Sequence, residues 1–229
     1  MTIGFSNEPL LRSKQQELDI QDLSGAWHFR YSILGQTFSS IYTRIDQIFA
    51  LWGLMSVIIF TSAQVWHVSW QQLALGWSGL TVVGVFSMVA MVRFWARVER
   101  LMWLVYSWAA LMLVGTAITD WGVFGYVGPV LVNLCPLWLG LCAVGYGLTG
   151  WGIRSRTFLG LTLLHVVAAF TVTQLGAWQY AATGLIIGGS LLLLTQLQWD
   201  MRPPIEYAML SEEQQLFNRQ QHLLREEGA

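Results

Sequence analysis

Charged side chains are scarce in this sequence, and long stretches of it hold none. Only 11% of the 229 residues are Asp, Glu, Lys or Arg, whereas 55% are hydrophobic, and the mean hydropathy is +0.50. A chain of this composition has too little polar surface to cover a water-soluble globule. The scarcity of charge therefore excludes an ordinary soluble domain and indicates a membrane protein.

Cysteine and lysine are also nearly missing, and their absence excludes several kinds of site. Cys135 and Cys142 are the two cysteines. Seven residues apart on one helix, they would be separated by about 10.5 Å along its axis, too far for a disulfide. With no CxxC motif and no Cys/His cluster, the sequence does not support a zinc or iron–sulfur centre. The sole lysine, Lys14, precedes the first apolar run, which excludes a retinal Schiff base inside the membrane.

Catalytic motifs are missing as well. The sequence contains no HExxH, no P-loop and no GxSxG to carry hydrolysis or nucleotide chemistry. The apolar runs contain no carboxylate, which argues against a proton-coupled carrier, and Asp120 is expected in a turn between two runs. These absences favour a non-enzymatic protein.

Six apolar runs are each long enough to cross a membrane. A helix rises 1.5 Å per residue, so about 20 mainly apolar residues cover the roughly 30 Å of hydrocarbon. We expect an all-α polytopic membrane protein whose six transmembrane helices form three hairpins. The predicted spans are residues 47–66, 74–95, 101–119, 123–149, 157–175 and 178–199.

The basic residues predict the orientation of these spans. All twelve Lys and Arg residues fall on the side of the membrane that holds both termini in a six-helix arrangement. The positive-inside rule therefore predicts cytoplasmic N- and C-termini. Arg97, Arg100, Arg154 and Arg156 form a predicted inner basic face. This face either meets an anionic lipid or partner, or serves only to orient insertion.

The chain divides into three parts on this basis. Residues 1–46 form a cytoplasmic or interfacial N-terminal segment, 47–199 the six-helix bundle and 200–229 a cytoplasmic tail. Apolar residues between 27 and 38 favour a short interfacial helix or an irregular arm. In the tail, leucines at helical spacing after Ser211 predict a short amphipathic helix. This helix either docks a partner or rests against its own bundle.

The fourth run contains the strongest candidate for a ligand-binding site. Pro129 and Pro136 each remove a backbone donor and free a carbonyl group one turn earlier, and Asn133 lies between them. We expect a broken outer half of this helix with Asn133 facing a cavity; the alternative is a plain proline kink. Trp138, further along this run, and Trp108 in the third run are either packing residues or an aromatic wall for a flat ligand.

His165 is the candidate for binding a cofactor. It lies eight residues into the fifth run, about 12 Å from its inner end and so near the middle of the bilayer. A neutral imidazole at that depth either hydrogen-bonds another helix or ligates a haem iron or a chlorophyll magnesium. No cofactor is the first expectation, and haem or chlorophyll is the alternative.

Packing between helices has one clear signal. Gly184 and Gly188 make a GxxxG motif in the sixth run, where two backbones can approach closely. We expect a seam within the molecule, with a homo-oligomer face as the alternative.

Three functional hypotheses follow. The first is a non-enzymatic membrane protein that binds a protein partner or a lipophilic molecule, such as an assembly or accessory subunit of a larger membrane complex. The second is a small transporter or channel for a neutral solute through the broken fourth helix, and the third is a haem or pigment protein ligated by His165. The expected location is a bacterial cytoplasmic membrane, or alternatively a thylakoid membrane. The expected partners are membrane lipid and membrane proteins, with no nucleic acid.

Overall fold

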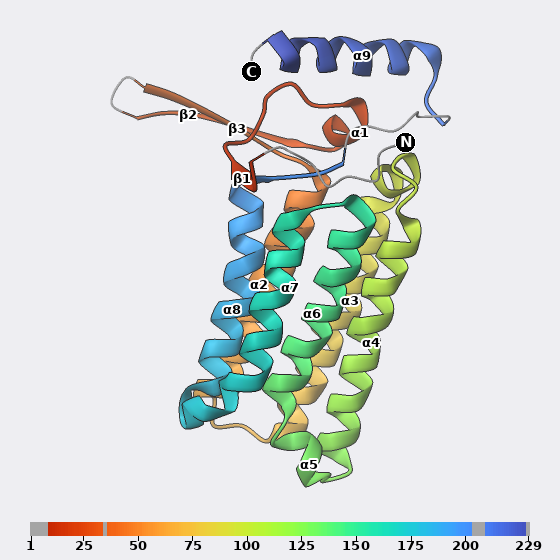
Figure 1. The fold of residues 1–229 in the computed structure, drawn as a ribbon. Helices are drawn as coiled ribbons and strands as arrows, with labels where there is room; N and C mark the ends of the chain where they lie inside the picture. Colours follow the sequence, from red (N-terminus) through yellow and green to blue (C-terminus); the bar gives the residue numbers. More distant parts are fainter. Residues whose placement is uncertain (1–8, 34–35, 203–208, 228–229) are drawn as a thin grey trace.

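The computed structural model describes residues 9–33, 36–202 and 209–227. The remaining residues of the predicted N-terminal segment (1–8 and 34–35) and of the predicted tail (203–208 and 228–229) lie outside the described part. Most of the described chain is helical, and the long helices stand side by side as an upright bundle (Figure 1). The long helices are α2 (Arg44–Val65), α3 (Trp70–Val98), α4 (Met102–Phe124), α6 (Leu134–Ile153), α7 (Arg156–Thr171) and α8 (Gln179–Gln196).

Short elements connect the long helices and cover one end of the bundle. These are α1 (Ile20–Leu23), α5 (Gly128–Leu131), the 3-10 helix η1 (Val172–Trp178), α9 (Glu212–Glu227), β1 (Leu11–Arg12), β2 (Trp27–Ile33), β3 (Gln36–Tyr42) and β4 (Gln198–Trp199). The strands, α1 and α9 lie together at one end, which we call the capped end (Figure 1). The opposite end, where α5 and η1 lie, is the α5 end.

Within the described residues, five stretches are long and apolar enough to cross a membrane, judged by length and composition. They are α2, α3, α4, α6 and a 41-residue stretch, Arg156–Gln196, that contains α7, η1 and α8. Inside η1, Gly176 has φ 55° and ψ −119°, a backbone conformation that glycine tolerates. The chain reverses there, and α7 and α8 run beside each other (Figure 1). These findings are consistent with the predicted helical membrane protein.

The predicted fourth run, residues 123–149, is broken in its outer half, as expected, and is not a single kinked helix. The chain leaves α4 at Phe124, forms the single turn α5 and starts α6 at Leu134. Pro129 is in the first turn of α5 and Pro136 in the first turn of α6. Backbone N–H groups have no helical partner in a first turn, so proline removes no hydrogen bond there. The two prolines therefore begin helices instead of bending one.

The predicted interfacial helix or arm at residues 27–38 is also wrong. β2 pairs with β3 as an antiparallel hairpin, from Trp27 opposite Tyr42 to Ile33 opposite Gln36. Apolar and polar residues alternate along β2, and this period of two is typical of a strand. A second ladder joins β1 to β4. The all-α prediction therefore holds for the bundle but not for the capped end.

The GxxxG motif forms a seam between α2 and α8, as predicted for a contact within the molecule. A Cβ on Gly184 would meet Phe60 Cβ at 2.8 Å. On Gly188 it would meet Val57 Cγ2 at 2.6 Å and the Gly53 carbonyl oxygen at 2.9 Å. The two helices approach so closely that only hydrogen fits at these positions.

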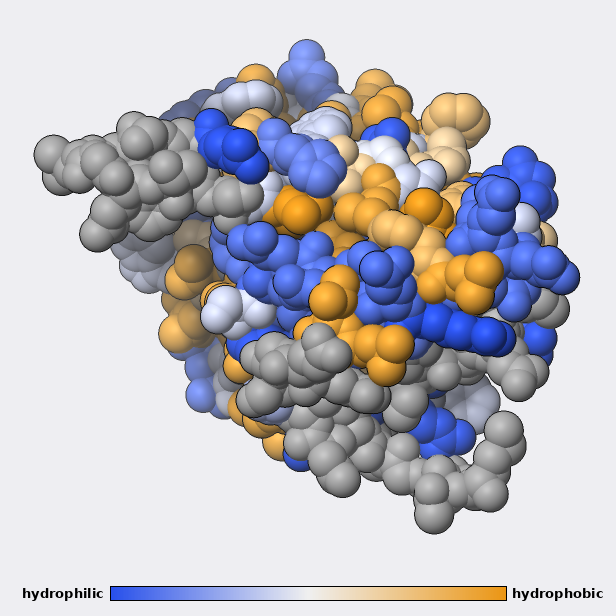
Figure 2. Space-filling model, turned by 90° about the horizontal axis from the view of Figure 1, so that it is seen from above, coloured by the Kyte–Doolittle hydropathy of each residue, from blue (hydrophilic) through white to orange (hydrophobic). Residues whose placement is uncertain are grey.

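The predicted amphipathic helix of the tail is α9, which lies across the capped end (Figure 1). It contacts its own chain through polar side chains: buried Asn218 accepts from Ile20 N at 2.8 Å and donates to Gln21 Oε1 at 3.1 Å. Leu216, Leu223 and Leu224 are exposed by 61%, 60% and 45%. Seen from this end, hydrophobic patches lie between hydrophilic residues on the surface (Figure 2). α9 thus rests on its own protein and leaves these three leucines largely exposed.

Candidate functional site

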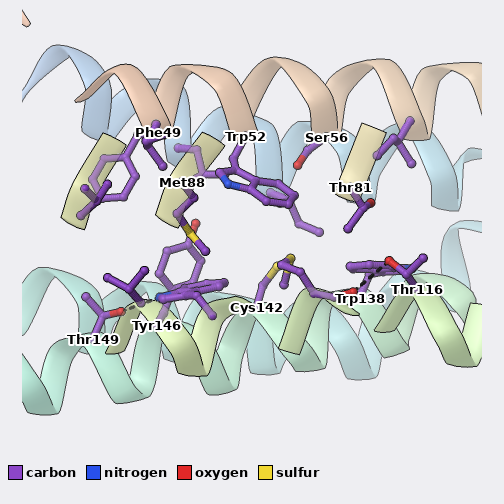
Figure 3. Close-up of a pocket in the computed structure, with 18 of the residues that line it drawn as sticks. Phe49, Trp52, Ser56, Thr81, Met88, Thr116, Trp138, Cys142, Tyr146 and Thr149 are labelled. Carbon is purple, nitrogen blue, oxygen red and sulfur yellow. Dashed lines mark hydrogen bonds between the residues drawn. The ribbon is translucent and has the colours of Figure 1, made fainter. Parts of the chain in front are cut away.

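An elongated cavity of about 150 Å³ lies inside the bundle, bounded mainly by α2, α3, α4 and α6. Along α2 its wall runs from Ile45 to Phe60, and along α6 from Trp138 to Ile153. Each of these stretches rises by about 22 Å, so the cavity follows the bundle axis over much of its length. Figure 3 shows side chains of facing helices pointing toward one another across it.

The wall of the cavity is almost entirely apolar and rich in aromatic rings. Its few polar side chains are hydroxyls, indoles and one carboxylate, Asp120, and no cation belongs to the described wall. The aromatic residues of the wall are Phe49, Trp52, Phe60, Trp77, Trp95, Trp108, Trp138, Tyr146, Phe158 and Trp199. A cavity of this kind suits an uncharged, lipophilic molecule.

Asp120 is not in a turn, as the sequence had suggested. α4 continues to Phe124, so Asp120 is helical and half-buried at the end of the cavity nearest α5. Both of its carboxylate oxygens accept from Ser78 Oγ, at 2.9 and 2.8 Å. The carboxylate therefore joins α3 to α4 there.

Most indole N–H groups in the cavity wall have a hydrogen-bond acceptor. Trp108 donates to Thr149 Oγ1 at 3.0 Å and Trp138 donates to Thr119 Oγ1 at 3.1 Å. These threonines in turn donate to backbone carbonyl groups of their own helices. Trp77 donates to Ser62 Oγ at 3.0 Å. These groups need no ligand to satisfy them.

Trp52 and Tyr146 differ from the other polar groups of the wall. Trp52 Nε1 and Tyr146 Oη are both buried, and neither has a hydrogen-bond partner in the described chain. An unpaired buried donor costs about 1–3 kcal/mol. The cavity therefore presents two unsatisfied donors on facing helices, α2 and α6 (Figure 3).

Of the residues predicted at the fourth run, Trp138 lines the cavity, and Asn133, Pro129 and Pro136 do not. Asn133 is exposed, and its Nδ2 donates to the Pro129 carbonyl oxygen at 2.8 Å. Asn133 therefore does not line this cavity: α6 starts after it at Leu134, and its side chain turns back onto α5. Trp108 of α4, the other residue predicted for an aromatic wall, also lines the cavity, at the depth of Thr149 and not of Trp138.

His165 is fully buried but lies behind the wall of the cavity. Its Nδ1 is 2.8 Å from the Leu161 carbonyl oxygen, and its ring packs against that of Tyr146 with centroids 4.8 Å apart. Its Nε2 has no partner within the described residues. In residues 9–33, 36–202 and 209–227 no cluster of three or more His, Cys, Asp or Glu residues is suited to hold a metal ion. Ligation of haem or pigment by His165 stays a prediction.

The predicted basic face lies at the capped end. Arg97, Arg100 and Arg156 are exposed and Arg154 is half-buried. Arg97 is in the last turn of α3, and Arg154 ends α6 in a left-handed conformation, φ 54°. Arg156 contacts the buried carboxylate of Asp200 at 3.3 Å, so it is partly neutralised. A free basic surface is thus smaller than the sequence suggested.

Carboxylates of the N-terminal segment lie close to Glu99, the residue that follows α3. Gln21 Nε2 donates to Glu99 Oε1 at 3.1 Å, and Trp95 Nε1 donates to Asp22 Oδ1 at 3.0 Å. Burial raises the pKa of Asp22 to about 7, helped by the charges of Asp19 and Glu99. Burial also raises the pKa of Glu99, opposed by Arg202. On α9, Arg225 and His222 pair with Asp19.

Asp22 predicts how the stability of the protein depends on pH. Its pKa is about 7 in the folded protein against 3.8 as the ordinary value, so the folded state holds this proton more tightly than the unfolded state does. The contribution of Asp22 to stability is therefore greatest below that ordinary value and is lost as the pH rises through about 7. We expect Asp22→Asn, which keeps an acceptor for Trp95, to be more stable than the wild type at pH 8 and equal to it at pH 4. Unfolding midpoints followed by circular dichroism in detergent would measure this.

The control is Glu212→Gln, which removes an exposed carboxylate from α9. It should follow the wild type at both pH values. A difference between Asp22→Asn and the wild type that does not change with pH would contradict the assignment.

The chain was also compared with known proteins. No protein-family model, no curated protein and no solved structure matches it.

Proposed function

We propose that this chain is a non-enzymatic integral membrane protein that holds a lipophilic molecule inside its helical bundle. The observation that carries the proposal is the elongated cavity, whose wall is apolar and aromatic and holds no cation among its described residues. Water gains few hydrogen bonds in such a space, whereas an apolar chain gains contacts along its length.

The proposed arrangement in the membrane has six spans. α2, α3, α4 and α6 each provide one, and the reversal at Gly176 divides the 41-residue stretch into two, α7 and α8. The twelve basic residues support cytoplasmic N- and C-termini, with the capped end facing the cytoplasm. A bacterial cytoplasmic membrane is the proposed location, and a thylakoid membrane is the alternative.

A role as an accessory subunit of a membrane complex is the second candidate. The exposed leucines of α9 favour it, because a soluble helix surface with several large apolar side chains is typical of a protein contact. The transporter alternative has less support, since Asn133 is exposed and lies outside the cavity wall.

Filling the cavity tests the proposed function. Thr81 is 2% exposed and lines the cavity. We expect Thr81→Phe to lower the amount of apolar molecule that purifies with the protein by about 10-fold or more, because the added ring takes up the space. The measurement is mass spectrometry of organic extracts from protein washed exhaustively in mild detergent, expressed per mole of protein.

The matched control is Val83→Phe, two residues along α3, where the side chain is 61% exposed. It adds a ring of the same kind outside the cavity and should leave the amount unchanged. If the wild type carries no apolar molecule, or if both variants carry as much as the wild type, the proposed function is wrong.

A further inference from the structure

We infer that the molecule in the cavity carries an uncharged carbonyl group whose oxygen accepts hydrogen bonds from Trp52 Nε1 and Tyr146 Oη. This inference rests on the proposed function and adds the chemical class of the ligand. It starts from the two donors of the cavity wall that have no partner in the described protein.

The two donors lie at the same depth in the bundle. Trp52 is eight residues from the start of α2 and Tyr146 seven residues from the end of α6, so both are about 10–12 Å from the capped end. Each is on the cavity wall, and in Figure 3 the two side chains point from α2 and α6 into the space between these helices. An acceptor on the occupant at this depth is therefore placed to meet these donors.

The contrast with the neighbouring indoles makes these donors informative. Trp77, Trp108 and Trp138 share the same wall, and each donates to a hydroxyl group of the protein. Trp52 alone among these four has its buried N–H unpaired within the described structure. Buried polar groups are nearly always paired, so an unpaired donor facing a cavity points to an acceptor on the occupant.

The charge of the wall decides which acceptor fits. No Lys, Arg or His belongs to the described wall, and its one charged group is the carboxylate Asp120. An ionised carboxylate or phosphate in this space would have no cation to pair with, at a large desolvation cost. A neutral carbonyl oxygen has no such cost and accepts two hydrogen bonds.

The remaining length of the cavity takes an apolar chain. From Trp52 to Phe60, and from Tyr146 to Trp138, the wall continues toward the α5 end for about 12 Å. Met112 and Thr116 of α4 line it between these helices. The ligand class is therefore a neutral carbonyl joined to a long apolar chain. Two kinds of lipid share this chemistry: a quinone with an apolar tail and an acyl ester.

The test compares carbonyl probes with a hydrocarbon on the same variants. Binding of 2-decyl-1,4-benzoquinone, methyl undecanoate and decylbenzene, which share a ten-carbon chain, is measured by titration calorimetry on the full chain in detergent. Trp52→Phe and Tyr146→Phe each remove one donor and keep a ring. Tyr106→Phe and Trp121→Phe are the controls, because these residues are 58% and 61% exposed on α4. Unfolding midpoints confirm that each variant is folded.

We expect Trp52→Phe and Tyr146→Phe each to weaken binding of at least one carbonyl probe by about 3- to 10-fold, as for one lost hydrogen bond. Decylbenzene should bind all variants as it binds the wild type. If the variants bind only the quinone more weakly, the ligand carbonyl belongs to a ring. If they bind only the ester more weakly, it belongs to an acyl group. Weaker binding of both probes assigns the shared carbonyl chemistry.

Two results would overturn the inference and leave the proposed function intact. One is unchanged binding of both carbonyl probes to Trp52→Phe and Tyr146→Phe. The other is an equal loss for decylbenzene, which would mean that the substitutions act on the shape of the cavity. If neither decylbenzene nor a carbonyl probe binds the wild type, the proposed function fails together with the inference.

Discussion

Asp200→Ala is expected to lower the free energy of unfolding by about 3–5 kcal/mol, because it removes a buried charge from a hydrogen-bonded network. Asp200 is fully buried just after β4 and accepts from Ser155 Oγ, Arg156 N and Thr157 N at 2.8, 2.9 and 3.0 Å. The last two are the first N–H groups of α7, which have no partner in their own helix. The substitution leaves all three donors unpaired. Unfolding by denaturant in detergent, followed by circular dichroism, would measure the loss.

A second variant and the dependence of stability on pH show whether the charge of Asp200 causes that loss. Asp200→Asn keeps the size and one acceptor oxygen but removes the charge. Its free energy of unfolding should therefore lie between those of the wild type and the alanine variant. Burial alone would raise the pKa of Asp200, but the hydrogen bonds from Thr157, Arg156 and Ser155 outweigh it and lower the pKa. The stabilisation is thus present above the ordinary pKa and lost as the pH falls through the lowered one. An alanine variant as stable as the wild type at pH 7 would contradict this account.

Gly188→Leu is the other substitution with a large expected effect, about 3 kcal/mol or more of lost stability. A side chain there would meet Val57 Cγ2 at 2.6 Å and the Gly53 carbonyl oxygen at 2.9 Å, so α8 would have to move away from α2. Backbone atoms cannot rotate aside as the end of a flexible side chain can. The expected result is a lower unfolding midpoint and a larger fraction of misassembled protein in gel filtration.

Gly189 offers a control one residue away. A Cβ at Gly189 would meet only Leu185 Cδ1 at 3.9 Å among the described atoms, an ordinary contact. Gly189→Leu has the same change in size and in helix propensity, and should stay within about 0.5 kcal/mol of the wild type. Equal losses for the two variants would show that the seam does not depend on close approach at Gly188.

The helices of the bundle were predictable because their signal is local. About 20 apolar residues in a row predict a span wherever its neighbours lie, and α2, α3 and α4 appear within a few residues of their predicted ranges. The break in the fourth run was predictable from its prolines, but its form was not: Pro129 and Pro136 each lie in the first turn of a new helix. The strand β2 was predictable from the alternation after Trp27.

The cavity could not be predicted in the same way. Its volume depends on how far side chains of all six long helices fill the space between them, and no single run of residues contains that information. Trp108 and Trp138 were identified as deep aromatic residues, whereas Trp52 and Tyr146 were not. What distinguishes the latter pair is a missing partner, and that is known only once every neighbouring acceptor has been located.

The ladder at the capped end has a consequence for the order in which the protein is made. Leu11 of β1 pairs with Trp199 of β4, so the first strand of the chain finds its partner only after the bundle between them has been synthesised. The Thr157 hydroxyl, which donates to the Leu10 carbonyl oxygen at 2.6 Å, is also made late. During translation the β2–β3 hairpin has its partner at once, whereas β1 lacks its partner until β4 has been made. The cap can therefore close only after both α7 and β4 have been made.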